Sequence, residues 1–260
     1  MLKLAANLSF LYQELAFLCR FEAAAKDGFK GVEYLFPYGW SGPELFNLLN
    51  NNGLKQVLFN TSAGDWNAGE RGLACLPGRE QEFQDSITLA LEYAATLQCP
   101  QIHIMAGLRD ETIAHSAQLE IYHQNLTFAA TECAKSNVIA LIEPINAKDI
   151  PGFFLENVAM AASTLEVVGH SNLKIQFDIY HIQRTDGDIC QQYLANADNI
   201  GHLQIANPPH RSEPSNGEIN YPYIFEFLES EGYSGWIGCE YKPSTTASQT
   251  LGWAKEFLTC

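Results

Sequence analysis

The chain has 260 residues, a formal net charge of −15, and 47% hydrophobic against only 17% charged residues. A chain of this length and apolar content can bury a large core, and its composition does not indicate disorder. The negative charge argues against an extended surface for nucleic acid or for anionic membranes, although a few basic groups inside a cleft can still bind a small anion.

Eight short apolar runs are typical of buried strands, and segments of helical period fill most of the gaps between them. The strand-like runs cover about residues 2–8, 31–36, 54–60, 101–107, 138–145, 173–180, 200–206 and 235–241. The helical segments cover residues 11–27, 43–52, 80–98 and 117–135. The first ends at Asp27-Gly28, and the second opens with Pro43 and finishes at Asn52-Gly53, as helices often do.

Eight strands that alternate with helices most economically form a single (β/α)8 TIM barrel, an α/β fold, over residues 1–260. An open, doubly wound sheet would need a glycine-rich phosphate turn after its first strand, and residues 7–10 contain no glycine. Two long loops follow the third and seventh strands, at about residues 61–79 and 207–220. Loops of this length are typically functional or disordered, so we expect both to act as lids on the catalytic face.

Seven cysteines are scattered along the chain without a C-x-x-C pair. This pattern argues against a disulfide framework and a structural zinc site, and it favours a reducing compartment. The first apolar stretch is interrupted by Asn7, Gln13 and Glu14 and does not resemble a signal peptide. Because no run reaches the roughly 18 apolar residues of a membrane span, we expect a cytoplasmic protein.

Four oxygen-bearing side chains stand near the ends of the last four strand-like runs. They are Glu143, Asp178, Gln204 and Glu240. Because the parallel strands of a barrel end around one mouth, we expect these four side chains to surround a single site. Oxygen ligands favour Mg²⁺ or Mn²⁺ over zinc, which prefers nitrogen and sulfur. The pattern therefore predicts a divalent-metal site.

Two members of this ring, Glu143 and Glu240, are carboxylates that can also move protons. A cation that polarises a ketone, one glutamate that removes a proton and another that delivers it to the neighbouring carbon suit aldose–ketose isomerisation. Basic residues near the same strand ends predict contacts to a substrate carboxylate, and Arg211 suits bidentate geometry best. The predicted substrate contacts are His181, His210, Arg211 and Lys242.

Further polar residues allow both a structural and a functional interpretation. Glu33 is either an inward-facing polar residue near the mouth of the barrel or a buried structural carboxylate. His103 is interpreted as a satisfied core histidine rather than a ligand. Asn7 stands at the end of the first strand, where a minor possibility is contact with a ligand.

The first long loop carries its own charged cluster. Asp65, Glu70 and Arg71 either close over the substrate, with Glu70 as a substrate contact, or form an ion pair that holds the loop. Trp66 is expected to pack the loop against the barrel.

Nine segments carry a family resemblance that extends over nearly the whole chain. They are FPY (36–38), AGDWNAGERG (63–72), PGRE (77–80), LIEPIN (141–146), IPGF (150–153), IQFDIYHIQR (175–184), GHLQIANPPHR (201–211), GEINYPY (217–223) and GWIGCEYKP (235–243). In these segments the chain resembles the hydroxypyruvate isomerase family. The resemblance implies a xylose isomerase-like TIM barrel that converts hydroxypyruvate to tartronate semialdehyde through an enediolate.

The resemblance also implies roles for individual residues. Glu143 and Glu240 would be the catalytic acid–base pair, and the same two residues with Asp178 and Gln204 would hold the metal. Related ketose epimerases have a histidine after the aspartate in the same way, which supports His181 as a substrate contact. The expected partner is a small anionic keto acid, and because barrels of this type often pair, a homo-oligomer stays open.

Three alternatives accompany this prediction. A sister group that isomerises 2-oxo-tetronate, one carbon longer, shares much of the pattern and provides the alternative substrate. A non-catalytic sugar-acid binding protein would keep the ring but move no proton. A DNA-repair endonuclease of the same superfold would need clustered histidine ligands and a basic groove, which seven histidines in a chain of charge −15 argue against.

Overall fold

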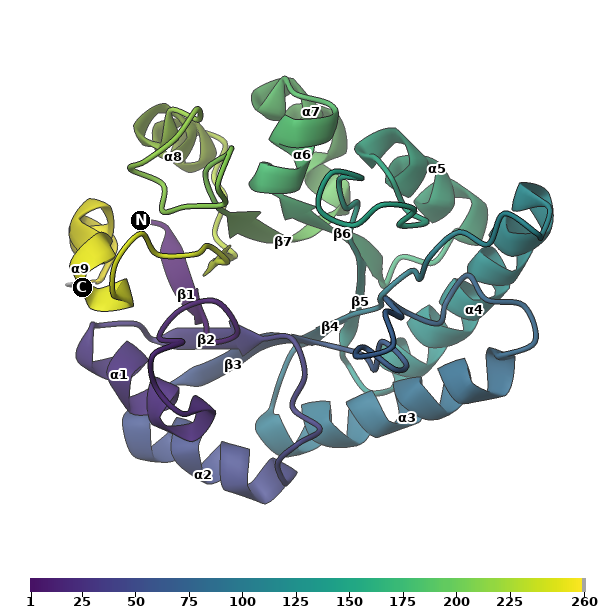
Figure 1. Ribbon diagram of the computed structural model, residues 1–260, viewed down its shortest axis with the longest axis horizontal. Coiled ribbons are helices and arrows are strands. Elements are labelled where there is room, and N and C mark those ends of the chain that lie inside the picture. The colour runs from purple at the N-terminus through teal and green to yellow at the C-terminus, as the bar shows by residue number, and fades with distance from the viewer. Residues whose placement is uncertain (259–260) are drawn as a thin grey trace.

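The computed structural model describes residues 1–258, and its eight strands form a closed parallel barrel in chain order, with β1 paired to β8. The predicted TIM barrel is therefore confirmed. Figure 1 shows the strands at the centre and the helices around them. The strands are β1 (Lys3–Asn7), β2 (Gly31–Tyr34), β3 (Lys55–Asn60), β4 (Gln101–His103), β5 (Ile139–Ile142), β6 (Leu173–Asp178), β7 (Ile200–Ile205) and β8 (Trp236–Cys239).

The outer layer consists mainly of α-helices between successive strands. They are α1 (Arg20–Lys26), α2 (Gly42–Asn52), α3 (Glu80–Leu97), α4 (His115–Lys135), α5 (Val158–Val168), α6 (Ile179–Thr185), α7 (Ile189–Asn196), α8 (Tyr221–Ser230), α9 (Ala247–Thr250) and α10 (Lys255–Leu258). Short 3-10 segments cover Phe17–Cys19, Ala197–Asn199 and Leu251–Ala254. No helix within residues 1–258 combines the length and the apolar character that a bilayer crossing requires.

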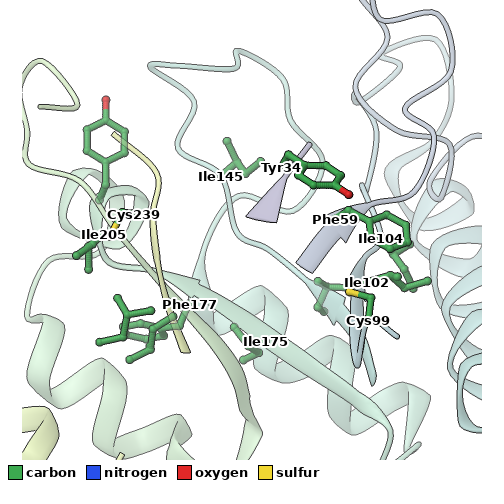
Figure 2. Packing of buried hydrophobic residues seen from close by; sticks show 14 of the residues in the cluster. Tyr34, Phe59, Cys99, Ile102, Ile104, Ile145, Ile175, Phe177, Ile205 and Cys239 are labelled. Carbon is green, nitrogen blue, oxygen red and sulfur yellow. The ribbon is translucent and has the colours of Figure 1, made fainter. Parts of the chain in front are cut away.

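Strand side chains alternate between the helix layer and the barrel interior. Ile175 and Phe177 of β6 and Ile205 of β7 belong to the large apolar core that also contains helical side chains. Figure 2 shows Ile205 beside Cys239, as the pairing of β7 with β8 requires. Because one set of alternate residues is buried against the helices, the intervening set has to point into the barrel.

The inward-facing set changes from apolar to polar along the barrel axis. A small separate cluster of buried residues, Ala5, Val57, Leu58 and Leu141, lies in the interior. Two residues beyond Ala5 and Leu141 on the same faces are Asn7 and Glu143, at the carboxyl ends of their strands. Along the inward face of these strands, every second side chain therefore changes from apolar inside the barrel to polar at its mouth.

The helix expected over residues 11–27 forms only in its second part, and residues 8–15 are turns. Tyr12 adopts a φ of +59°, in the left-handed region that interrupts a right-handed helix. Its buried hydroxyl donates to Asp27 Oδ2 at 2.8 Å. The same turn places the Phe10 ring 4.8 Å from the guanidinium of Arg211, so tertiary packing overrides the helical period.

We expect Gly238→Ala to lower the free energy of unfolding by about 2 kcal/mol, the usual range for overpacking. A Cβ at Gly238 would lie 2.2 Å from Glu33 Oε1, whose carboxylate is fully buried and hydrogen-bonded. Gly39→Ala is the matched control, since no atom lies within 4 Å of its added Cβ. Urea unfolding monitored by circular dichroism provides the measurement. Equal stabilities of the two variants would show that Glu33 can move aside without cost.

Candidate functional site

A cavity of about 600 Å³ opens where the strands end. Its inner wall consists of strand-end side chains: Asn60, His103, Glu143, Gln176 and Glu240. Its outer wall consists of loop and helix residues: Phe10, Leu35, Trp66, Arg71, Met105, Ile145, Lys148, Asp149, Ile150, Tyr180, His181, Arg184, Pro209, His210, Arg211 and Lys242. Both long loops contribute, because Trp66 and Arg71 come from residues 61–79 and Arg211 from residues 207–220.

Glu240, which follows β8, is held by donors on both carboxylate oxygens. Its Oε2 accepts hydrogen bonds from Asn7 Nδ2 at 3.0 Å and from Gln204 Nε2 at 2.5 Å. Its Oε1 accepts from Arg211 Nη2 at 2.5 Å. The side chain is therefore fixed from three directions before any ligand binds.

Glu33 lies next to Glu240 in the same network. Its Oε1 accepts from the same two amides, Asn7 Nδ2 at 3.0 Å and Gln204 Nε2 at 2.8 Å. Its Oε2 lies 2.7 Å from His202 Nε2, and both side chains are fully buried. The strand register brings these groups together, since Asn7 pairs with Glu33 across β1 and β2. Glu33 is thus a buried support of Glu240, one of the two roles considered for it.

Asp178 ends β6 and also caps α6. Its Oδ1 accepts from the backbone N–H of Tyr180 at 2.9 Å, which fixes the carboxylate by an ordinary N-cap bond. Its Oδ2 then faces Arg211 Nη2 at 3.2 Å and His181 Nε2 at 3.4 Å. One helix start therefore orients a carboxylate toward the interior of the site.

Arg211, whose side chain is 12% exposed, is the cation that contacts the carboxylates of the site. Its guanidinium lies 4.8 Å from the rings of both Phe10 and Tyr180, and it contacts Asp178 and Glu240. The backbone at Arg211 has a φ of +55°, which is uncommon for a residue other than glycine. The predicted substrate contact is thus already bonded to two carboxylates, and its remaining Nη1 faces His181 and Asp149.

Glu143 has much looser surroundings than Glu240. Its Oε2 lies 3.6 Å from His103 Nδ1 and its Oε1 lies 3.9 Å from His181 Nε2, both beyond hydrogen-bond range. Its Oε1 is buried and accepts no hydrogen bond from residues 1–258. His103 is buried, as expected for a core histidine, but neither of its ring nitrogens has a hydrogen-bond partner among these residues, and the side chain lines the cavity.

Burial and mutual repulsion change the proton affinity of these groups. Burial, together with the charges of Glu240 and Asp178, raises the pKa of Glu143 well above its usual range. Burial also raises the pKa of Glu240 to about 8 and that of Asp178 to about 6, against the opposing charge of Arg211. Burial lowers the pKa of His103 to about 3. Glu143 and Glu240 thus retain protons near neutral pH, when free carboxyls have lost theirs.

The donor set fits a cation. Glu143, Asp178 and His181 each offer one atom within 4.8 Å of the others. The free oxygen of Glu143 and the excess of buried negative charge both favour an added positive ion. Gln204, the amide-bearing member of the predicted ring, directs Nε2 to Glu33 and Glu240, while its Oε1 accepts from Gln176 Nε2 at 2.7 Å.

Three further predicted substrate contacts occupy different environments. His210 and Lys242 line the outer cavity, where both residues are exposed. Glu70 is not among the lining residues, because its carboxylate pairs with Arg79 and accepts from the backbone N–H of Asp65. From this loop, Arg71 instead lines the cavity, and its guanidinium stacks 3.9 Å from the Trp66 ring.

Several site residues are absent from the sequence-based predictions. Gln176 and His202 occupy inward-facing positions of β6 and β7, two residues before Asp178 and Gln204. The period of two that places the strand-end residues inside the barrel also selects these two, and it provides the signal that would have found them. Asn146 lies in the connection after β5, and its contact to His181 follows only from the tertiary structure.

Comparisons with known proteins identify the family and agree with the fold. Residues 21–257 match the family described as Xylose isomerase-like TIM barrel. The chain is 50% identical to 2-oxo-tetronate isomerase from Cupriavidus necator over 98% of each chain. It is 48% identical to hydroxypyruvate isomerase from Escherichia coli, over 97% of this chain and 98% of the relative. The crystal structure of AP endonuclease, family 2 from Brucella melitensis covers 99% of this chain and all of its own, with a TM-score of 0.97 and 42% identity.

In the metal-free protein, we expect the stability gained by Glu143→Gln over the wild type to increase as pH rises from 5 to 8.5. The folded pKa of Glu143 lies above its unfolded value, so its protonated form stabilises the fold at low pH and this contribution is lost as pH rises. Because glutamine does not titrate, the variant does not lose this stability as pH rises. Urea unfolding with chelator present measures the difference at each pH.

The exposed Glu156→Gln controls for the loss of one formal charge. A difference between Glu143→Gln and the wild type that stays constant, or that shrinks with pH, contradicts the raised pKa.

Proposed function

This chain belongs to the xylose isomerase-like TIM barrel family, and we propose that it interconverts hydroxypyruvate and tartronate semialdehyde. The isomerase class predicted from the sequence agrees with the names of both curated relatives. The observation that carries the proposal is a pair of buried carboxyls, Glu143 and Glu240, which line one cavity and have raised pKa values. The expected cytoplasmic location and homo-oligomeric state stay predictions.

The reaction needs proton transfer and no external oxidant or reductant. One proton leaves the hydroxymethyl carbon of hydroxypyruvate, and one is added to the neighbouring carbonyl carbon, through an enediolate. A second proton moves from the original hydroxyl oxygen to the original carbonyl oxygen. A base and an acid with pKa values near the working pH serve such steps best. Burial raises the pKa of both carboxyls from their usual acidic range, that of Glu240 to about 8 and that of Glu143 well above its ordinary value.

The two glutamates differ in their hydrogen bonding, which suits different roles. Glu240 is anchored by Asn7, Gln204 and Arg211, and its carboxyl therefore changes protonation at a fixed position. Glu143 lines the same cavity, and its Oε1 accepts no hydrogen bond within residues 1–258. It can therefore approach a substrate carbon without first breaking a protein bond.

The predicted metal ring is retained in the proposal. Glu143, Asp178, Gln204 and Glu240 would hold Mg²⁺ or Mn²⁺, the ions that oxygen ligands prefer. Gln204 Oε1 accepts one hydrogen bond and keeps a second lone pair for a cation. When bound, the ion would polarise the ketone and stabilise the negative charge of the enediolate.

The basic groups of the outer cavity match a carboxylate substrate. Arg71, Lys148, Arg184, His210 and Lys242 line it, in a chain that is otherwise strongly acidic. A local reversal of charge of this kind attracts a small anion and orients its carboxylate away from the glutamates. These groups favour a keto acid over a neutral sugar.

Two alternatives can be weighed against the same features. The cavity of about 600 Å³ has room for a fourth carbon, so 2-oxo-tetronate stays the alternative substrate. A nuclease function is not proposed, because the net charge of −15 opposes binding to a polyanion. The single three-residue metal group found within residues 1–258 also contains only one histidine.

We expect Glu143→Gln and Glu240→Gln to lose solvent-deuterium exchange into hydroxypyruvate by a factor on the order of 10² to 10⁴, the usual contribution of a general acid or base. Proton NMR of the substrate in D₂O measures the rate, and circular dichroism checks the fold. Glu156→Gln, exposed on the surface, should exchange at the wild-type rate. Wild-type protein that binds hydroxypyruvate without any exchange would instead be a sugar-acid binding protein.

Metal dependence and substrate length can be measured together. We expect chelator to lower turnover and added Mg²⁺ or Mn²⁺ to restore it, because the ring carries excess negative charge without a cation. Steady-state assays should compare kcat/KM for hydroxypyruvate and 2-oxo-tetronate under each condition. Full activity after exhaustive chelation contradicts the metal requirement, and a higher kcat/KM for the longer acid selects the alternative substrate.

A further inference from the structure

Asn146 and His181 form a buried pair at the edge of the site. Asn146 lies in the connection between β5 and α5, three residues after Glu143, and His181 lies in α6, three residues after Asp178. Both side chains are almost fully buried, at 1% and 3% exposure. Asn146 Nδ2 is 2.6 Å from His181 Nδ1, so each group restricts the other's hydrogen bonding.

The local backbone fixes the orientation of the Asn146 amide. Its Oδ1 accepts hydrogen bonds from the backbone N–H groups of Lys148 at 3.1 Å and Asp149 at 3.0 Å. A backbone N–H can only donate, so the amide oxygen has to face this turn. The amide nitrogen, a donor with no lone pair to offer, therefore faces His181.

This orientation decides which nitrogen of His181 carries a proton. The backbone N–H of Asn146 also points to His181 Nδ1, at 3.4 Å. A ring nitrogen that faces two donors has to present its lone pair. The proton of the neutral imidazole then lies on Nε2, which is directed toward Asp178 Oδ2 at 3.4 Å and Glu143 Oε1 at 3.9 Å.

Arg211 provides the one opposing contact. Its Nη1, also a donor, lies 3.3 Å from His181 Nε2. A neutral imidazole accepts on only one nitrogen, so the Asn146 and Arg211 contacts cannot both be hydrogen bonds. The Asn146 contact is the shorter, at 2.6 Å, and its amide cannot turn, whereas Arg211 Nη1 has Asp149 Oδ2 within 3.7 Å as another partner.

We propose that Asn146 is a positioning residue that holds His181 as the Nε2–H tautomer, so that His181 donates a hydrogen bond to a substrate oxygen and does not coordinate the metal. This inference rests on the proposed function for the identity of the substrate, but not for the tautomer. A donor beside Glu143 would stabilise the negative oxygen of the enediolate. The metal would then depend on oxygen ligands alone, although His181 lies close enough to be a ligand.

The tautomer can be measured without any assay of activity. In the full chain labelled with ¹⁵N-histidine and treated with chelator, long-range ¹H–¹⁵N spectra distinguish protonated from unprotonated ring nitrogens, and His181→Gln assigns the signal. We expect Nε2 of His181 to be protonated and Nδ1 unprotonated. A proton on Nδ1 overturns the inference. Addition of Mg²⁺ should leave the Nε2 proton in place, and its loss would show that His181 is a ligand.

Asn146→Asp reverses the hydrogen-bonding sense of the side chain. Its second carboxylate oxygen would accept from Nδ1–H, so we expect the proton of His181 to move to Nδ1. The kcat of the isomerisation should then fall by a factor on the order of 10² to 10³, as when an oxyanion donor is lost, with a smaller change in KM. A wild-type tautomer in this variant, or an unchanged kcat after the tautomer has moved, contradicts the positioning role.

Asn157→Asp provides the matched control in the same connection. Asn157 caps α5 by accepting from the backbone N–H of Met160 at 2.8 Å, a role that aspartate also fulfils. It should change neither the His181 spectrum nor kcat. If Asn146→Asp fails to fold, the wild-type spectra with and without Mg²⁺ still decide the inference. A wild type with the Nε2–H tautomer but no isomerase activity would refute the proposed function and leave the tautomer assignment intact.

Discussion

The anchoring of the Glu240 carboxylate is the interaction on which the rest of the site depends. Asn7 and Gln204 donate to one of its oxygens and Arg211 to the other, while the same two amides also support Glu33. A buried carboxylate without such partners would cost several kcal/mol. Gln204 lies on the neighbouring strand β7 and Arg211 on the loop that follows it, but Asn7 lies on β1 and reaches Glu240 only because β1 pairs with β8. Closure therefore assembles the site as well as the core.

These partners offset only part of the negative charge of the buried carboxyls, and the charge that is left has a use. Arg211 is a single guanidinium among the carboxyls of Glu143, Asp178 and Glu240, all of which have raised pKa values. A fully neutralised cluster would be more stable, but it would bind neither a cation nor a transferable proton with any strength. The stability lost to repulsion is thus the source of the chemistry, as is common where buried acids act as catalysts.

The sequence predicts the strand ends well because two simple rules determine them. Buried parallel strands end in loops at one mouth, and the period of two selects Glu143, Asp178, Gln204 and Glu240 as inward-facing. The rules give no information about partners, which depend on register between strands and on loop packing. The burial of Arg211 between Phe10 and Tyr180 illustrates this, since its left-handed backbone and the broken helix near Tyr12 are both tertiary effects.

The division between strand ends and loops also explains why the type of reaction is easier to infer than the length of the substrate. In the proposed reaction, proton transfer needs the glutamates and their supports, which lie on or next to strand ends. In the same proposal, discrimination between three and four carbons depends on the distance from these groups to the cations of the outer wall, such as Arg71 and Lys242. Those cations lie on loops, where sequence changes alter the distance between the cations and the glutamates without disturbing the barrel. A change of substrate can therefore occur while the glutamates and their supports stay unchanged.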